Sequence, residues 1–358
     1  MLKPLRISLR VIAGLLALVL LAALAYVGYV VFSYSRIPDH QALAPEGEAS
    51  ALAQTGRAYT VVTQNLGFGA YTPDFTFFMD GGVGSRAVSP ESVRACIEEG
   101  ARTVAALSPD FVFFQEVDID SDRSYHIDER TLLSPFFESC TSVFAQNYHS
   151  AYLFYPFYEP HGASQSGLLT VSRLAVSQAS RRSLPISEGF SKFLDLDRCY
   201  SVSRVPCENG KELVLFNVHL SAYGGSDEIR TAQMTQLLSD MQAEFEKGNY
   251  AVCGGDFNHD FTGHSTQDLN GGESVDFGWA QPFPDALLAQ TGIRRADGYQ
   301  ALVPTCRNCD VPYQEGNFTI IVDGFLVTEN VEILSVQNVD TRFSYSDHNP
   351  AVLRFLLK

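Results

Sequence analysis

The amino-acid sequence predicts a mixed α/β (α+β) protein in which sheets lie between layers of helices, preceded by one transmembrane helix. A long apolar run near the N-terminus predicts the membrane helix. Beyond it, short β-rich segments outnumber the few helical patterns and alternate with them, which favours sheets sandwiched between helical layers. Several of these segments end on a polar residue of a kind that binds metals or phosphate, so the functional site is expected at strand ends.

Residues 11–32 form an unbroken apolar run, and no charged residue lies between Arg10 and Arg36. A helix rises about 1.5 Å per residue, so one of this length crosses the hydrocarbon core of a bilayer. The alternative is a cleaved signal peptide with its small-residue cleavage site at residues 23–25, but the apolar run continues past that site. We therefore expect an uncleaved anchor whose partner is the lipid bilayer.

The charges that flank the apolar run predict its orientation. Only Arg36 follows the run closely, whereas three basic residues precede it: Lys3, Arg6 and Arg10. By the positive-inside rule, residues 1–10 lie in the cytoplasm and the rest of the chain lies outside, as a single-pass protein of the cell membrane. Residues 33–57 are rich in Ala, Pro, Gly, Glu and Gln, which is the composition of a flexible linker.

Residues 58–358 are expected to form the folded part, which is long enough for one large α/β domain or two small ones. The net charge is -16 and the pI is about 4.8, so most of the surface repels polyanions. A nucleic acid or a phospholipid headgroup must therefore be met by a local feature. A bound divalent cation is the obvious candidate.

Seven cysteines are compatible with disulfides in an oxidising exterior, and the odd number leaves at least one free thiol. Cys306 and Cys309 lack a second Cys or His pair at zinc-finger spacing, so a loop disulfide or two free thiols are favoured over zinc. Cys199 and Cys207 are close enough in the sequence to bridge a local excursion of the chain.

The elements of residues 58–358 follow from side-chain periodicity and turn signals. Ser89 and Pro90 offer an N-cap and a first-turn proline for a helix that ends at Ser108. Ser226 caps a second helix, on which apolar residues recur at helical spacing up to Phe245. Runs of β-branched and aromatic residues predict strands at 59–65, 111–114, 151–155, 167–176, 199–205, 212–218, 250–256, 318–322, 324–327 and 351–356.

The strand at 250–256 runs into a carboxylate and a carboxamide two positions apart, Asp256 and Asn258. The side-chain period of an extended chain is two, so both can face the same way. Gly254 and Gly255 are expected to leave room for a ligand beside the backbone. The alternative is an Asx turn that closes the strand, since Asp and Asn favour turns. The choice depends on whether other strand ends deliver matching groups.

Other strand ends do carry matching groups. The residues at or near these ends are Asn65, Glu116, His219, Asp256, Asn258, Asp323, Asp347 and His348. Carboxylates, amides and histidines in this combination match a hard metal with oxygen ligands together with a phosphate. Five further histidines have no such partner and are expected at the surface or in loops: His126, His149, His161, His259 and His264.

Six short stretches resemble, in order, the motifs of the endonuclease/exonuclease/phosphatase superfamily, which has the DNase I-like fold. They are TQNL (63–66), QEV (115–117), NVHL (217–220), GGDFN (254–258), VDGF (322–325) and SDHNP (346–350). The resemblance covers residues 59–357. The gap between Asn65 and Glu116 is longer than the pattern and indicates an inserted loop, and Asp323 is followed by Gly-Phe where members often carry an aromatic residue or His.

The resemblance implies a four-layer αββα sandwich with the site at one edge. It implies that Glu116 holds Mg²⁺ or Mn²⁺ with help from Asn65 and Asp347. Asp256 is then expected to orient or deprotonate the attacking water.

The resemblance also implies which residues contact the phosphoryl group. Asn258 and His219 are expected to hydrogen-bond its oxygens, and His348, kept cationic by Asp323, to stabilise the transition state. Arg123 follows Glu116 closely and is a candidate for contact with the substrate phosphate, with a plain salt bridge as the alternative.

The sequence thus predicts a divalent-metal-dependent phosphoester hydrolase, a phosphodiesterase or phosphatase, on the outer face of a membrane. The alternatives are an extracellular nuclease on DNA or RNA, a sphingomyelinase or phospholipase-type headgroup hydrolase, and an enzyme for a soluble phosphate ester. A non-catalytic binding domain is disfavoured because the motif residues are intact. Substrate selectivity is expected in loops at 67–88, 120–165 and 262–315, and no protein partner is predicted.

Overall fold

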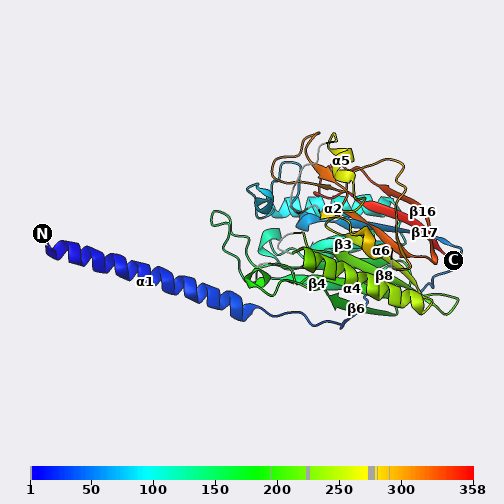
Figure 1. Ribbon diagram of the computed structural model, residues 1–358, viewed down its shortest axis with the longest axis horizontal. Coiled ribbons are helices and arrows are strands. Elements are labelled where there is room, and N and C mark those ends of the chain that lie inside the picture. The colour runs from blue at the N-terminus through cyan, green and yellow to red at the C-terminus, as the bar shows by residue number, and fades with distance from the viewer. Residues whose placement is uncertain (1, 194, 223–225, 273–278, 280, 290) are drawn as a thin grey trace.

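The computed structural model describes residues 2–193, 195–222, 226–272, 279, 281–289 and 291–358. Helix α1 (Leu2–Ser33) projects from a body built on two large sheets (Figure 1). Within the described residues, it is the one helix long and apolar enough to cross a membrane, over Ile7–Ser33, and its apolar window is not buried against the body. The expected span at 11–32 lies inside it.

The first sheet has six strands in the order β16-β17-β2-β3-β5-β4. Their bounds are Val331–Asn338, Ala351–Leu357, Ala58–Asn65, Phe111–Asp118, Gln165–Ser172 and Thr141–His149. Helices α2 (Pro90–Ala106) and α3 (Glu129–Leu133) cover its outer face. Ser89 caps α2 by accepting from the amide of Ser92, as its sequence predicts.

The second sheet has seven strands in the order β1-β6-β7-β8-β9-β15-β12. Their bounds are Gln41–Leu43, Gln178–Ser183, Cys199–Pro206, Glu212–His219, Tyr250–Asp256, Asp323–Thr328 and Ile293–Arg295. Helices α4 (Asp227–Glu246) and α6 (Asp285–Leu288) cover its outer face. Leu237, Leu238 and Met241 of α4 are buried in this outer core, and Ser226 is its N-cap.

Short elements occupy the loops that surround the site. They are β10 (His259–Asp260) paired with β11 (Gln281–Pro282), β13 (Cys306–Arg307) paired with β14 (Thr319–Ile320), α5 (Ser265–Leu269), and the 3-10 helices η1 (Gly67–Gly69), η2 (Phe78–Asp80), η3 (Asp122–Ser124), η4 (Ser134–Phe136) and η5 (Phe190–Phe193).

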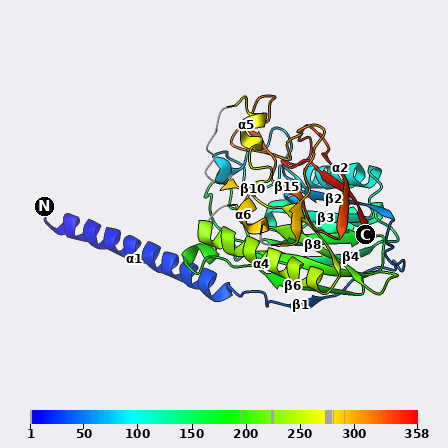
Figure 2. The same ribbon diagram turned by 45° about the vertical axis from the view of Figure 1, so that its right-hand side comes forward.

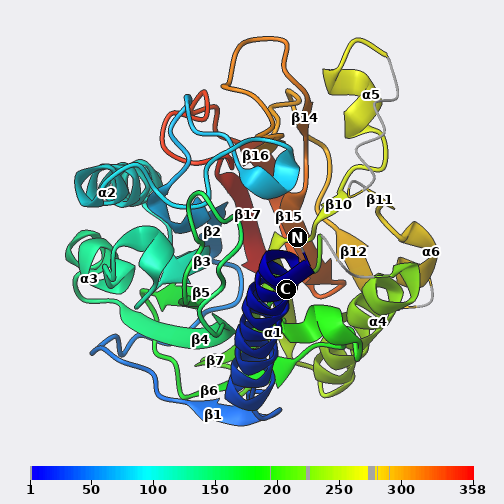
Figure 3. The same ribbon diagram turned by 90° about the vertical axis from the view of Figure 1, so that its left-hand side faces the viewer.

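The central core lies between the two sheets. Phe113 of β3, Leu353 of β17, Leu215 of β8, Val252 of β9 and Phe325 of β15 belong to one buried cluster. Each fully buried side chain of this size contributes about 1.5–3 kcal/mol relative to exposure. Viewed along α1, one pair of helices lies outside each sheet (Figure 3), so the prediction of a four-layer αββα sandwich is confirmed.

The prediction of a flexible linker at 33–57 is wrong for much of the segment. Strand β1 pairs antiparallel with β6 along one edge of the second sheet (Figure 2). The amide of Ile37 donates to Asp197 at 2.6 Å, and Ala53 is fully buried in the central core. Main-chain pairing and one buried alanine leave no hydrophobic pattern in the sequence, so composition alone suggested a free chain.

Two smaller expectations also differ from the structure. Residues 151–155 form no strand beyond one isolated bridge, between Leu153 and Gly162. Cys199 opens β7 and Cys207 follows its end, which places them about 26 Å apart along an extended strand, beyond the reach of a disulfide. All seven cysteines are free thiols.

Candidate active site

Three predicted site residues lie in one row across the second sheet. His219 on β8 pairs with Asp256 on β9, and Asp256 pairs with Asp323 on β15. Residues directly opposite each other in a sheet present their side chains on the same face. The register therefore brings a histidine and two carboxylates from distant parts of the sequence to one edge.

The first sheet delivers Asn65 and Glu116 to the same edge. The register of β3 against β5 shifts between Phe114 and Val117, and Glu116 has a φ of 54°, a backbone conformation uncommon for a residue other than glycine. A bulge of this kind re-aims a side chain near a functional site. The side-chain amide of Asn65 donates to Glu116 Oε1 and to Asp256 Oδ2, both at 3.2 Å, and so links the two sheets.

Asp256 and Asn258 form a turn as well as a site. The backbone N–H of Asn258 donates to Asp256 Oδ1 at 2.9 Å, and this hydrogen bond forms an Asx turn. The side-chain amide of Asn258 donates to the Leu220 carbonyl at 2.8 Å. The Asx-turn alternative and the site therefore coexist, because the turn fixes both side chains.

The expectation that Gly254 and Gly255 leave room for a ligand is wrong. A Cβ at Gly254 would lie 2.6 Å from the ring of Phe325. A Cβ at Gly255, where φ is 150°, would lie 1.9 Å from the Val218 carbonyl oxygen. The two glycines thus allow close packing between neighbouring strands.

His348 is held by Asp323. Its Nδ1 lies 2.8 Å from Asp323 Oδ2 and its Nε2 lies 3.9 Å from Asp256 Oδ2. Burial alone would lower the pKa of His348, but Cys306, Asp323 and Asp347 together raise that pKa well above its usual range. His348 is therefore a cation at neutral pH.

Asp256 and His219 have the opposite electrostatic character. Burial raises the pKa of Asp256 to about 7, with His348 opposing the shift. Burial, with Arg198 and His348, lowers the pKa of His219 well below its usual range, so this histidine is neutral. Its Nε2 lies 3.5 Å from Asp256 Oδ2, and its buried Nδ1 has no hydrogen-bond partner within the described residues.

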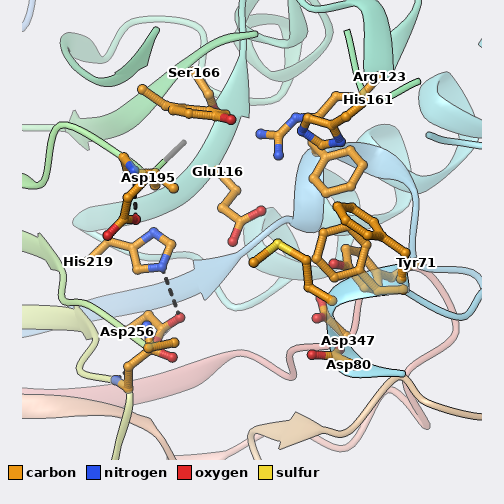
Figure 4. Close-up of a pocket in the computed structure, with 18 of the residues that line it drawn as sticks. Tyr71, Asp80, Glu116, Arg123, His161, Ser166, Asp195, His219, Asp256 and Asp347 are labelled. Atoms are coloured by element: carbon orange, nitrogen blue, oxygen red, sulfur yellow. Dashed lines mark hydrogen bonds and ion pairs between the residues drawn. The ribbon is translucent and has the colours of Figure 1, made fainter. Parts of the chain in front are cut away.

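A cavity of about 550 Å³ opens over these residues. Figure 4 shows Glu116 near its centre, with His219 and Asp256 on one side and Asp347 on the other. The predicted site residues that line the cavity are Glu116, Arg123, His219, Asp256, Asn258, Asp347 and His348. Asn65 and Asp323 are buried and do not line the cavity, and they are hydrogen-bonded to Glu116 and His348 respectively.

Arg123 forms the salt bridge that the sequence left open as the alternative to phosphate contact. Its guanidinium forms a bidentate pair with Asp118, at 3.0 Å and 2.7 Å, and lies 3.9 Å from the ring centre of Phe68. It also lines the cavity. The paired cation therefore contributes positive potential to the cavity wall.

The sequence did not identify several cavity residues from loops without motifs. His161 lies in a loop, as expected, but is buried, and burial followed by Arg123 lowers its pKa to about 4. The expectation of a surface or loop position is wrong for His259, which is buried in β10. Arg307 also lines the cavity, and its Nε and one terminal nitrogen have no hydrogen-bond partner in the described chain. Tyr71 and Asp80 come from the inserted loop at 67–88 (Figure 4).

The carboxylates of Glu116 and Asp347 fit a hard divalent cation. Both line the cavity. Enclosure raises the pKa of Asp347 to about 7, with His348 opposing the shift and Glu116 adding to it. Two carboxylates that face one cavity form an oxygen donor set whose charge a divalent cation neutralises. Asn65 helps to fix Glu116, because the Asn65 side chain donates to Glu116 while its own Oδ1 accepts from the backbone N–H of Gly67 at 3.0 Å.

A second acidic group is less suited to a metal. Ligand atoms of Asp256, Asp323 and His348 lie within 4.8 Å of one another. However, Asp323 Oδ2 and His348 Nδ1 are already joined to each other at 2.8 Å. Binding a metal there would require that hydrogen bond to break and would place the metal against the cationic His348.

The fold and the site define a phosphoesterase-type αββα protein, and the sequence agrees. The sequence profile of the Endonuclease/Exonuclease/phosphatase family matches residues 63–348, so the chain belongs to that family. Among curated proteins, none matches the chain significantly.

Solved structures resemble the chain at low sequence identity. An endonuclease/exonuclease/phosphatase from Beutenbergia cavernae is 18% identical with a TM-score of 0.56, over 84% of this chain and 72% of that chain. ANGEL2, a 2′,3′-cyclic phosphatase in complex with adenosine-2′,3′-vanadate, is 13% identical with a TM-score of 0.53, over 88% and 98%. D. rerio TDP2, complexed with a single-strand DNA product, is 14% identical with a TM-score of 0.51, over 83% and 98%. These likenesses show the shared fold.

Proposed function

We propose that the protein hydrolyses a phosphoester with the help of Mg²⁺ or Mn²⁺, on the outer face of a membrane. One observation carries the proposal: Asp256 is a buried carboxylate with the Nε2 atoms of His219 and His348 3.5 Å and 3.9 Å from the same oxygen. Glu116 and Asp347 face the same cavity. This arrangement combines a base, two hydrogen-bond donors and a cation site around one small space.

Each residue of the proposed site has a distinct role in the reaction. Asp256, with a pKa near 7, accepts a proton from the attacking water at neutral pH. The cationic His348, fixed by Asp323, donates to a phosphoryl oxygen and stabilises the charge that develops there. The neutral His219 donates its single N–H to another phosphoryl oxygen. Asn258, which also lines the cavity, donates a hydrogen bond from its side-chain amide to the phosphoryl group.

Glu116 and Asp347 are the residues that would hold the divalent ion. When bound, this ion supplies positive charge that neutralises the non-bridging oxygens of the phosphoester. The unpaired N–H groups of Arg307 and the paired guanidinium of Arg123 add positive charge to the cavity wall. These cations lie at the cavity itself, whereas the net charge of -16, which already counts them, opposes the approach of an anionic substrate over the surface as a whole.

The direct test measures hydrolysis by the full-length protein in detergent, with and without Mg²⁺. The substrates are bis-p-nitrophenyl phosphate, a diester, and p-nitrophenyl phosphate, a monoester. We expect metal-dependent release of p-nitrophenol that Asp256→Asn abolishes. The matched control is Asp268→Asn, which alters an exposed carboxylate 2.7 Å from His264 outside the cavity. Equal activity in the Asp256→Asn and Asp268→Asn variants would refute the proposal.

A further inference from the structure

Residues 152–158, here called the aromatic loop, expose an unusual amount of apolar surface. Phe154 is 48% exposed, Tyr155 64%, Phe157 84% and Tyr158 68%. The loop contains no charged residue. Clustered exposed aromatic side chains mark an interaction site, because isolated apolar residues are ordinary on a surface but contiguous groups of them are not.

The aromatic loop is joined to the membrane helix. The Tyr26 hydroxyl donates to the Tyr152 carbonyl at 3.0 Å and accepts from the Phe154 amide at 3.3 Å. The Tyr29 hydroxyl accepts from the Tyr152 amide at 3.1 Å. The rings of Tyr26 and Phe154 meet edge to face with centres 5.2 Å apart. In Figure 1 the loop lies on the side of the body from which α1 projects.

The length of α1 sets the depth of these contacts. Counted from Val11, where the predicted span begins, Tyr26 lies about 22 Å and Tyr29 about 27 Å along the helix, near the far side of a hydrocarbon core about 30 Å thick. Tyr26 and Tyr29 then stand at the boundary between hydrocarbon and headgroups, where tyrosine is enriched in membrane proteins. The aromatic loop, bonded to both tyrosines, lies at the same level.

The cavity opens at this level too. Tyr26 of α1, Leu153 and Tyr155 of the aromatic loop, and Met79 of η2 line the same cavity as Glu116. Its mouth therefore lies beside the surface of the membrane that holds α1. A substrate whose phosphorus lies in the headgroup layer needs only a short displacement to reach Asp256, which also lines the cavity.

We propose that the aromatic loop inserts into the outer headgroup layer, and that the substrate is the phosphoester of a membrane-lipid headgroup. This inference rests on the proposed hydrolase function. Water attacks phosphorus and one phosphorus–oxygen ester bond breaks. The water's proton passes to Asp256, and the leaving oxygen takes a proton from solvent or from His348.

The chemistry favours a zwitterionic lipid over a polynucleotide. The net charge of -16 repels a long polyanion and an anionic bilayer surface, and the uncharged aromatic loop supplies no basic residue to attract either. The occupant of the space beside the mouth is the bilayer itself, because α1 is anchored in it. Phosphatidylcholine and sphingomyelin are therefore suitable probes.

The first experiment measures insertion without activity. The full-length chain is placed in phosphatidylcholine vesicles that contain brominated phosphatidylcholine as a quencher. Tryptophan replaces Phe157 in one variant and Leu334 in another, while Trp279, the single native tryptophan, provides a constant background. Leu334 is 41% exposed on β16, which lies far from α1 in Figure 1. We expect stronger quenching for Phe157→Trp than for Leu334→Trp; equal quenching would overturn the insertion.

The second experiment measures substrate choice. The full-length protein in vesicles of phosphatidylcholine and sphingomyelin is followed by phosphorus NMR, which detects cleavage of either ester bond. We expect lipid hydrolysis that Phe157→Ser lowers about tenfold, in line with the loss of one aromatic side chain that inserts into the headgroup layer, and that Leu334→Ser leaves unchanged. Neither residue lines the cavity, so both variants should hydrolyse bis-p-nitrophenyl phosphate in detergent at the unaltered rate.

The outcomes separate the two proposals. Hydrolysis of the soluble diester without hydrolysis of vesicle lipid, or efficient cleavage of plasmid DNA that Phe157→Ser does not affect, would overturn the lipid substrate and leave the hydrolase intact. The absence of hydrolysis with every substrate would overturn the proposed function itself. The quenching result reports on the aromatic loop in either case.

Discussion

The pair formed by His348 and Asp323 provides a quantitative test of the site. Asp323 Oδ2 lies 2.8 Å from His348 Nδ1, and both side chains are buried. Burial lowers the pKa of His348, and Asp323 opposes this through both its charge and its hydrogen bond, so Asp323→Asn should lower that pKa and reduce the cationic fraction of the imidazole. The loss of one charged transition-state donor costs about 10²-fold in kcat, or about 2.7 kcal/mol. We expect His348→Ala to show this loss and Asp323→Asn to reproduce most of it.

The double variant that combines Asp323→Asn with His348→Ala tests whether the two residues act together or independently. If Asp323 acts only through His348, the double variant should be little slower than His348→Ala, with a coupling energy of about 2.7 kcal/mol. His219→Ala should be comparably slow, but Asp323→Asn should not mimic it, because Asp323 does not contact that ring. The assay is kcat for bis-p-nitrophenyl phosphate under saturating Mg²⁺. A loss near 10⁴-fold in the double variant, the product of independent effects, would refute the pairing.

Three further predictions address the metal, the membrane and stability. Glu116→Gln should abolish high-affinity Mg²⁺ binding measured by calorimetry, because it removes one carboxylate of the donor pair; unchanged affinity would contradict the assignment. Protease added to intact cells should digest the chain beyond residue 58 and spare a short N-terminal fragment, whereas full protection would place the domain inside. Burial alone would raise the pKa of Glu244, but hydrogen bonds from Arg204, Lys247 and Asn249 lower it to about 2. Its stabilising contribution is therefore complete above the unfolded pKa of about 4.3 and is lost as pH falls towards 2. Acid titration of the melting temperature should be flatter in Glu244→Gln, and identical slopes would exclude this contribution.

The positions of His219, Asp256 and Asp323 at strand ends were predictable because each position depends on the local sequence pattern of its own strand. Each residue ends or begins a strand whose apolar pattern is visible in the sequence, and the order of the motifs indicated that the three belong to one site, whereas their pairing comes from the structure. The bulge that turns Glu116 towards the cavity had no such signal, since it depends on the register between β3 and β5.

The cavity walls were not predictable for a different reason. Tyr71, His161 and Arg307 come from loops, and their positions follow from packing between segments far apart in the sequence. The Arg307 side chain donates to the carbonyl of Thr72, a partner 235 positions away. No periodicity reports such a contact. Loop residues that set selectivity therefore stay hidden until the fold brings them together.

The short connection between α1 and the body gives the aromatic loop a fixed place beside the helix. A flexible chain the length of residues 33–57 would have a root-mean-square span of about 25–30 Å and would let the cavity face any direction. In the structure, the hydrogen bond of Ile37 to Asp197 leaves only residues 34–36 beyond the end of α1, which extend at most about 14 Å. The contacts of Tyr26 with the aromatic loop also oppose rotation of the body about the helix axis. The pairing of β1 with β6 and the hydrogen bond of Ile37 thus hold the start of the body close to the end of α1, a role that a free linker could not fill.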